Sequence, residues 1–94
     1  MERKYYWVYV LYSLKDHKQY IGFTMNLRRR FGEHNAGKTK STAPRRPFSL
    51  LFAELYISRA DAMRREKYFK TDPGKKTLKL MLKESLKEIL PGQP

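Results

Sequence analysis

The chain has no cysteine among its 94 residues. Disulfide bonds and thiolate metal sites are therefore excluded, although this absence does not indicate a compartment. Long apolar runs are missing too, because the longest candidate, YYWVYVLYSL at residues 5–14, is too short to span a bilayer. No small-residue cleavage site follows it, so we interpret it as a strand of a cytoplasmic protein and not as a signal peptide.

Acidic residues are also scarce, since 9 Asp and Glu stand against 21 Lys and Arg, which gives a formal net charge of +12. Such an excess opposes compaction through self-repulsion. We therefore expect a polyanionic partner. Nucleic acid is the first candidate, because phosphate neutralisation by Lys and Arg supplies most non-specific affinity, and an anionic membrane surface is the second. A basic surface that is merely solvated is the remaining alternative.

The pattern of apolar residues predicts three strands and three helices. The expected strands are residues 5–13, 19–24 and 48–57, and the expected helices are residues 27–36, 59–71 and 76–90. Asn26 suits the N-cap of the first helix, and Gly37 suits its left-handed end. Ser58 and Asp61 form a capping-box pair for the second helix. Residues 37–47, between the first helix and the third strand, contain two prolines and are expected to form a loop.

The order β-β-α-β-α-α defines an α+β fold, with a small three-stranded antiparallel sheet flanked by helices. Asp72-Pro73-Gly74 is expected to end the second helix and to separate it from the last helix. No internal repeat or long linker divides the sequence, so we expect one domain over residues 1–94, with a flexible tail at residues 91–94.

Glu66 is placed unusually for a surface glutamate. It shares a helical stripe with Ala62 and Phe69, which are apolar and predicted to face the core. A carboxylate in that position is costly unless it is paired or binds a metal. The simpler alternative is a glutamate at the border of the core that pairs with a neighbouring arginine.

Three consecutive arginines on the first predicted helix are separated by helical phase. Arg30 and His34 stand four residues apart on one face, at the edge of the stripe expected to pack on the sheet. Arg28 and Arg29 turn further toward solvent. The alternative is that all three arginines are solvated or contact phosphates non-specifically.

The two predicted N-terminal strands should form a hairpin. If Lys15 and Asp16 are a two-residue turn, Tyr9 lies opposite Gly22, and Tyr20 shares a sheet face with Tyr9. A loop one residue longer would place the two tyrosines on opposite faces, and the sequence alone does not choose between these registers.

These residues together resemble the GIY-YIG nuclease family, in particular its short stand-alone members. The namesake tripeptides correspond to Trp7-Val8-Tyr9 and Tyr20-Ile21-Gly22, and the second matches fully. The family's arginine, eight residues after the YIG glycine, corresponds to Arg30, and its frequent histidine to His34. Its glutamate, in an R-E-K context, corresponds to Glu66. The first-motif glycine is absent, as is the asparagine that many relatives carry after the glutamate helix.

The resemblance implies a metal-dependent endonuclease that hydrolyses phosphodiester bonds. Glu66 would hold one divalent ion, expected to be Mg²⁺ with Mn²⁺ as an alternative, and Arg30 would stabilise the charged phosphate. Tyr9 would orient or deprotonate the attacking water. A free phenol has a pKa of ~10, so Tyr9 can act as a base only if a cation lowers that value. Tyr20 would hydrogen-bond the water or the phosphate, and His34 would polarise a tyrosine or contact phosphate.

The expected partner is nucleic acid, with DNA ahead of RNA, and no membrane. Residues expected to grip its backbone are Arg28, Arg29, Lys38, Lys40, Arg45 and Arg46. Nothing among them reads bases, so we expect cleavage directed by substrate structure and not by sequence. Two rival hypotheses stay open: a nucleic-acid-binding module that has lost catalysis, and an interaction protein whose basic surface docks on an acidic protein.

Overall fold

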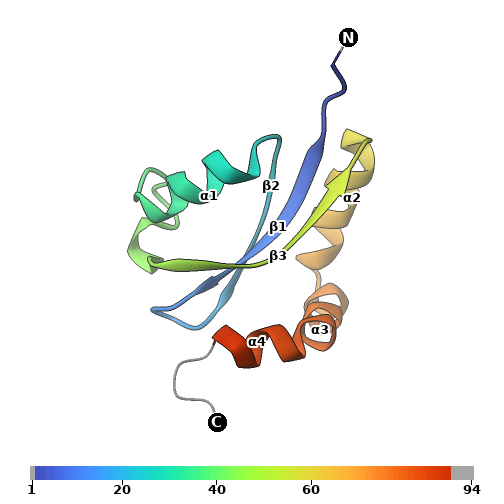
Figure 1. The fold of residues 1–94 in the computed structure, drawn as a ribbon. Helices are drawn as coiled ribbons and strands as arrows, with labels where there is room; N and C mark the ends of the chain where they lie inside the picture. The colour runs from blue at the N-terminus through green and yellow to red at the C-terminus, as the bar shows by residue number, and fades with distance from the viewer. Residues whose placement is uncertain (1, 90–94) are drawn as a thin grey trace.

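Three antiparallel strands form one sheet in the order β2-β1-β3 in the computed structural model, which describes residues 2–89 (Figure 1). The strands are β1 (Tyr6–Ser13), β2 (Gln19–Thr24) and β3 (Phe48–Tyr56). The helices are α1 (Leu27–Asn35), the 3₁₀ turn η1 (Ala43–Arg45), α2 (Arg59–Phe69), α3 (Asp72–Met81) and α4 (Lys83–Ile89). The predicted α+β class is confirmed, whereas the predicted tail at residues 91–94 lies outside the described residues.

The central strand β1 is buried on both faces, as its uninterrupted apolar sequence predicts. On one face, Val8 and Val10 pack into a core cluster with Phe69 and Leu78 from α2 and α3. On the other, Tyr9 packs with further sheet side chains under α1. Helix α1 therefore covers one face, and α2, α3 and α4 cover the other (Figure 1). Within residues 2–89, no helix combines the length and apolar character needed to cross a membrane.

The hairpin has the register that places Tyr9 opposite Gly22 and Leu11 opposite Tyr20. The connection is longer than the two-residue turn considered above. It is closed by the His17 N–H, which donates to the Ser13 carbonyl at 2.9 Å, and by the Ser13 N–H, which donates to the Lys18 carbonyl at 3.0 Å. Four residues, 14–17, lie between the paired residues Ser13 and Lys18. Because four is an even number, as two is, the alternation of side chains is unchanged and Tyr9 and Tyr20 share a face.

The first two helices begin where their caps predict. The Asn26 side chain accepts a hydrogen bond from the Arg29 N–H at 3.0 Å, and the Ser58 hydroxyl accepts one from the Asp61 N–H at 3.3 Å. Gly37 follows α1 with a φ of 76°, in the left-handed region that suits glycine.

The predicted last helix is wrong in its start and its continuity. Helix α3 begins at Asp72 and not at residue 76, because the Thr71 hydroxyl caps it by accepting from the Gly74 N–H at 3.1 Å. Proline is favoured in a first helical turn, so Pro73, the second residue of α3, fits this helix start. The helical stretch then divides at Leu82 into α3 and α4. Leu78 and Leu82 are nevertheless buried, as their spacing predicts.

Candidate active site

Tyr9 is buried in the sheet face under α1, with only 1 % of its surface exposed. Its ring lies over Gly22 on the neighbouring strand. A Cβ added at Gly22 would come within 2.3 Å of both Cζ and the hydroxyl oxygen of Tyr9. Only glycine therefore leaves room for the tyrosine ring at this cross-strand pair, which gives the glycine of the YIG tripeptide a steric reason.

A chain of hydrogen bonds leads from Tyr9 into α1 and the loop that follows it. The Tyr9 hydroxyl lies 2.9 Å from Nε2 of His34, and Nδ1 of His34 lies 2.8 Å from the hydroxyl of Thr42. The Thr42 hydroxyl donates in turn to the Thr39 carbonyl at 3.4 Å. We assign the proton of His34 to Nδ1, so that Thr42 accepts from the Nδ1–H while its own proton points to the Thr39 carbonyl, and Nε2 accepts from Tyr9.

Burial and neighbouring ionisable groups shift the pKa of both titratable groups of this chain toward the neutral form. His34 has no exposed surface, and the ring of Tyr20 meets it edge-on with centroids 5.0 Å apart. Burial, together with the charge of Arg30, lowers the pKa of His34. Burial and the nearby Tyr20 raise the pKa of Tyr9 to about 12, although the Arg30 guanidinium acts in the opposite direction.

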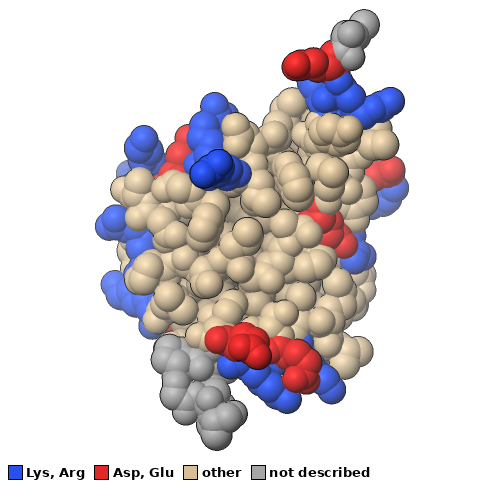
Figure 2. Space-filling model, in the orientation of Figure 1, with Lys and Arg blue, Asp and Glu red and all other residues tan. Residues whose placement is uncertain are grey.

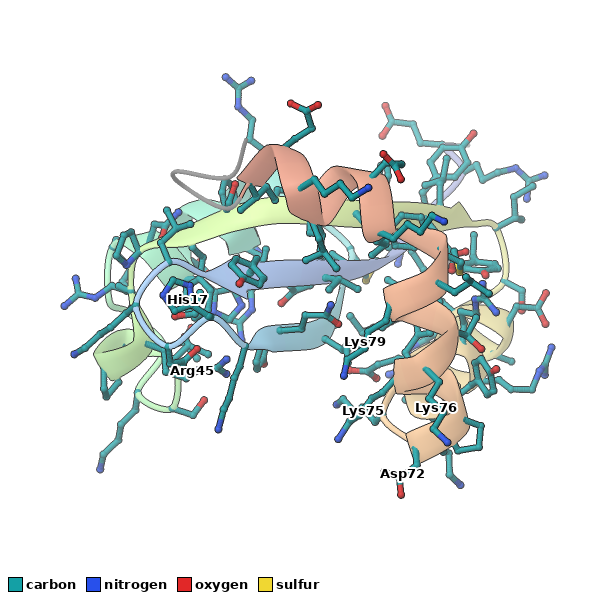
Figure 3. All side chains as sticks on the ribbon, turned by 90° about the horizontal axis from the view of Figure 1, so that it is seen from below. His17, Arg45, Asp72, Lys75, Lys76 and Lys79 are labelled. Carbon is teal, nitrogen blue, oxygen red and sulfur yellow. The ribbon has the colours of Figure 1, made fainter. Side chains whose placement is uncertain are left out.

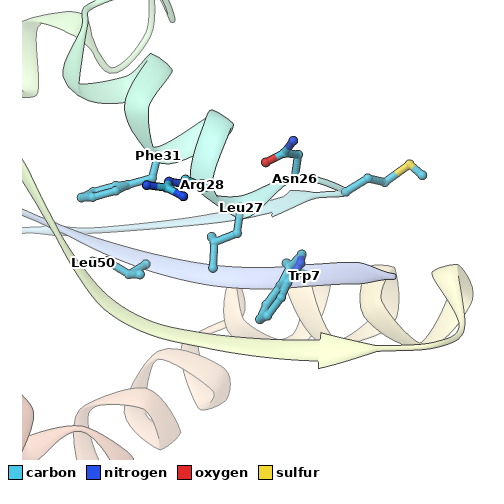
Figure 4. Close-up of a pocket in the computed structure, with 7 residues that line it drawn as sticks. Trp7, Asn26, Leu27, Arg28, Phe31 and Leu50 are labelled. Atoms are coloured by element: carbon cyan, nitrogen blue, oxygen red, sulfur yellow. The ribbon is translucent and has the colours of Figure 1, made fainter. Parts of the chain in front are cut away.

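Arg30 is the arginine of the triplet that faces this cluster. Its side chain is 35 % exposed, and its guanidinium is close enough to Tyr9 to influence the pKa of the phenol. Its Nη1 contacts Oε1 of Glu33 at 3.2 Å. Arg29 is 73 % exposed and lies 3.8 Å from the same carboxylate. Arg28 instead lines a separate hollow of about 500 Å³ between α1 and the sheet, next to Phe31 (Figure 4).

Glu66 lies on α2, within one turn of the fully buried Ala62 and Phe69. Its side chain is 20 % exposed, and its Oε2 lies 3.1 Å from Nζ of Lys70. Glu66 therefore pairs with a neighbouring cation, as the simpler alternative from the sequence predicts, but the partner is a lysine and not an arginine. The charge of Glu66 is the smallest of the influences on the pKa of Tyr9, and it acts to raise that pKa.

The residues present fit a divalent ion that keeps most of its water. Within residues 2–89, no group of three His, Asp or Glu side chains is placed to enclose a metal. Glu66 is the carboxylate that the family resemblance assigns to such an ion, and Glu33, which contacts Arg30 at 3.2 Å, is a second carboxylate near the cluster. A single carboxylate combined with substrate phosphate oxygens and retained waters is an arrangement typical of Mg²⁺.

An ion pair that sequence reasoning missed fixes α2 against the sheet. Nε and Nη2 of Arg65 lie 2.9 and 3.2 Å from the two carboxylate oxygens of Glu54 on β3. The same guanidinium stacks 4.2 Å from the ring centre of Phe69. This bidentate clamp, next to Glu66 in sequence, holds the helix that carries the glutamate.

The segment at residues 37–47 is anchored by polar contacts, although it lacks large apolar residues. Thr42 is 1 % exposed in its hydrogen bond to His34. Arg45 pairs with Asp16 at 2.6 Å and lies 5.6 Å from the ring centre of Phe48. Sequence reasoning missed Thr42, because its only signal was a polar residue two positions before a proline.

The residues expected to contact the nucleic acid backbone differ in exposure and in whether their side chains already have partners. Lys38 and Lys40 are exposed, whereas Arg45 is half-buried and held by its ion pair. Nε of Arg46 donates to the Ala43 carbonyl at 2.8 Å. On the face shown in Figure 2, Lys and Arg gather along the rim over α1 and the segment after it, and the middle is largely uncharged. Their roles in binding stay predictions.

The fold and this cluster of side chains define a GIY-YIG catalytic domain. The model of that family matches residues 5–79, and the chain belongs to the family. It is 40 % identical over 77 residues to a UPF0213 protein of Staphylococcus haemolyticus, covering 81 % of this chain and 93 % of the relative. It is 42 % identical to UPF0213 protein YazA of Bacillus subtilis, covering 81 % and 77 % respectively.

A solved structure agrees with the fold. The solution NMR structure of a UPF0213 protein from Bacillus halodurans superposes with a TM-score of 0.55 at 31 % identity, covering 90 % of this chain and 96 % of that one. The resemblance read from the tripeptides and their spacing is thereby confirmed at the level of the family.

Replacing Gly22 tests the steric argument. Gly22→Ala should lower stability by about 1–3 kcal/mol through overpacking and should displace Tyr9. The control is Gly32→Ala on α1, where no described heavy atom lies within 4 Å of the added Cβ and a gain of roughly 0.5–1 kcal/mol is expected. Denaturant unfolding of both variants measures this. A Gly22→Ala protein as stable as Gly32→Ala would contradict the account.

Replacing Thr42 tests the orientation of His34. Thr42→Val keeps the shape but leaves the Nδ1–H of His34 buried without an acceptor, which should lower stability by about 1–3 kcal/mol. Thr42→Ser, which keeps the hydroxyl, is the control. Imidazole ¹⁵N shifts of His34 should show the Nδ1–H tautomer in the wild type and in Thr42→Ser, and a mixture in Thr42→Val. Unchanged shifts in Thr42→Val would show that Thr42 does not select the tautomer.

Proposed function

We propose that this protein is a divalent-metal-dependent endonuclease that hydrolyses phosphodiester bonds of nucleic acid, with DNA as the favoured substrate. The observation that supports it most is the buried Tyr9–His34 hydrogen bond at 2.9 Å, with Arg30 close enough to act electrostatically on Tyr9. A phenol bonded to an imidazole and next to a guanidinium is a set of groups suited to charged phosphate chemistry.

The reaction is the attack of water on phosphorus and departure of the leaving oxygen in line. Negative charge gathers on the phosphate oxygens in the transition state, and the planar guanidinium of Arg30 stabilises it. Arg30 must then exchange its contact with Glu33 for the phosphate. Its partial exposure of 35 % leaves the side chain accessible to a substrate.

Tyr9 cannot supply a phenolate by itself at neutral pH. With a pKa of about 12, only roughly one phenol in 10⁵ is ionised at pH 7. The neutral imidazole of His34 offers a second route, because its Nε2 accepts from the Tyr9 hydroxyl. As water attacks, its proton passes to the oxygen of Tyr9 while the phenolic proton passes to Nε2 of His34, so Tyr9 relays a proton without becoming a free anion. The leaving oxygen takes up a proton from solvent water, and the imidazolium of His34 returns its extra proton through Tyr9 to solvent before the next turnover.

Glu66 is the residue that would hold the metal ion. When bound, a divalent ion supplies Lewis-acid stabilisation of phosphate charge. The contact of Glu66 with Lys70 at 3.1 Å would have to open for this role, and the Lys70 side chain, 55 % exposed, has room to turn into solvent. Tyr20 lines the same cluster and would orient the water or the phosphate.

Cleavage of labelled DNA with Mg²⁺ tests the proposal. Glu66→Gln and Arg30→Ala should each lower the rate by roughly 100-fold or more, because each removes several kcal/mol of transition-state stabilisation. The controls are Glu84→Gln on α4 and the exposed Arg29→Ala. Arg30→Ala should keep most of the binding, whereas Arg29→Ala should lose binding and keep the chemistry.

A second candidate function is supported by the pairing of these charges. Arg30 contacts Glu33, and Glu66 contacts Lys70. Such ion pairs are expected where charged side chains stabilise the fold and do not act on a substrate. A nucleic-acid-binding module without catalysis would bind DNA with strong salt dependence and would not cleave it with Mg²⁺ or Mn²⁺. Cleavage in the wild type that persists undiminished in Glu66→Gln would point to a contaminant and contradict the nuclease proposal.

A further inference from the structure

A second concave surface lies on the opposite side of the sheet from Tyr9. It is a groove of about 610 Å³ between the end of the β1–β2 hairpin and helices α3 and α4. Tyr12 and Ile21 form part of its apolar floor. Lys18 from the hairpin and Lys75 and Lys79 from α3 stand along its sides. We call it the hairpin groove.

The hairpin groove is strongly cationic. Its three lysines make no ion pair with any described residue, and none of the described residues that line it is acidic. Figure 3 shows Lys75 and Lys79 on the side of α3 that faces the hairpin, whereas Asp72 points away at the start of the helix. The acidic residue of the hairpin itself, Asp16, is taken by Arg45 at 2.6 Å.

The arrangement of the lysines suits a linear polyanion. Lys75 and Lys79 are one helical turn apart, so their side chains leave α3 in a row roughly 6 Å apart. Lys18 faces them across the groove from the hairpin. A small anion would need only one convergent cluster of donors, whereas a row of cations with a cation opposite follows an extended backbone.

The hairpin turn contributes an exposed ring to the groove. His17 has a φ of 60°, a left-handed conformation in which histidine is among the more frequent non-glycine residues. Its imidazole packs against Tyr12 with ring centres 6.1 Å apart and lines the groove while remaining exposed. A flat ring beside a row of cations is the combination that single-stranded nucleic acid uses for stacking and backbone contact.

Strand β2 joins the hairpin groove to the candidate active site. β2 is an edge strand, and its successive side chains alternate between the two faces of the sheet. Gln19 and Ile21 line the groove, whereas Tyr20 between them packs with Tyr9 and His34. A chain that crosses the edge of β2 therefore passes from one site to the other.

We propose that the hairpin groove binds the phosphodiester backbone of a nucleic acid strand next to the scissile bond, with Lys18, Lys75 and Lys79 contacting successive phosphates. The identity of this ligand rests on the proposed function, since the strand is the substrate of that same enzyme. The lysines of α3 are outside the set expected from the sequence, so the groove adds a second contact surface to the one over α1.

Paired charge variants test the proposal. Lys75→Gln/Lys79→Gln removes two groove charges, and the control Lys76→Gln/Lys83→Gln removes two exposed charges from α3 and α4 that do not line the groove. Binding is measured with EDTA present, by anisotropy of labelled single-stranded and duplex DNA of about 20 nucleotides, a length that exceeds the site of one small domain. Far-ultraviolet circular dichroism checks that each variant is folded.

The groove variant should bind roughly tenfold more weakly, and its slope of log affinity against log salt should fall by about 1.8 on duplex and about 1.4 on single strands, as expected for two lost phosphates. The control should change the slope much less. Equal losses in both variants, or no loss in either, would overturn the proposal. So would a wild-type protein that binds acidic protein or anionic vesicles but no nucleic acid.

Wild-type amide shifts provide a second measurement that needs no variant. Titration with unlabelled DNA should shift His17, Lys18, Lys75 and Lys79, and shifts confined to α1 would overturn the groove. The two proposals fail separately. If the wild type cleaves no nucleic acid but the groove variant loses binding, the groove proposal is kept and the nuclease proposal is rejected. If the wild type cleaves nucleic acid and the groove variant binds as well as the wild type, the nuclease proposal is kept and the groove proposal is rejected.

Discussion

The hydrogen bond between Tyr9 and His34 is the interaction on which the site depends. It joins β1 to α1 across 25 residues of sequence, and both partners are almost completely buried. Each would be costly to bury alone, because an unsatisfied polar group in the core loses its hydrogen bonds to water. Gly22 makes the space for the tyrosine, and Thr42 satisfies the other nitrogen of the imidazole.

The same burial that makes this bond strong makes Tyr9 a poor base. A phenol with a pKa of about 12 holds its proton at neutral pH, and the imidazole beside it stays neutral for the same physical reason. In the proposed reaction the pair therefore moves a proton only in concert with the incoming water. Arg30 and Glu66 keep partial exposure, and their contacts with Glu33 and Lys70 would be exchanged for contacts with a substrate.

The helix starts and the faces on which several site residues lie could be predicted from the sequence, because helical phase and capping depend on residues close together in the chain. Helical phase placed Arg30 with His34 and put Glu66 on the stripe of Phe69, and the caps at Asn26 and Ser58 located two helix starts. The hairpin register stays open in the sequence, because it depends on whether the loop holds an odd or an even number of residues. The structure has an even number and places Tyr9 and Tyr20 on one face.

What escaped prediction depends on contacts between distant segments. Thr42 is one polar residue in a polar loop until the fold brings it to His34, and Arg65 finds Glu54 only because α2 packs along β3. The start of α3 was missed because Asp72-Pro73-Gly74 was interpreted as a break. A threonine cap directly before it turns the same residues into a first helical turn.

The most direct test of the relay compares two tyrosines of one strand that face opposite ways. Tyr9→Phe removes the hydroxyl that contacts His34, and Tyr6→Phe removes one from the opposite face of β1, where Tyr6 packs against the core cluster. Cleavage of DNA with Mg²⁺ should fall by roughly 100-fold or more in Tyr9→Phe, as expected for the loss of a general acid–base group, and should stay near wild type in Tyr6→Phe. A Tyr9→Phe protein that cleaves as fast as Tyr6→Phe would contradict the account.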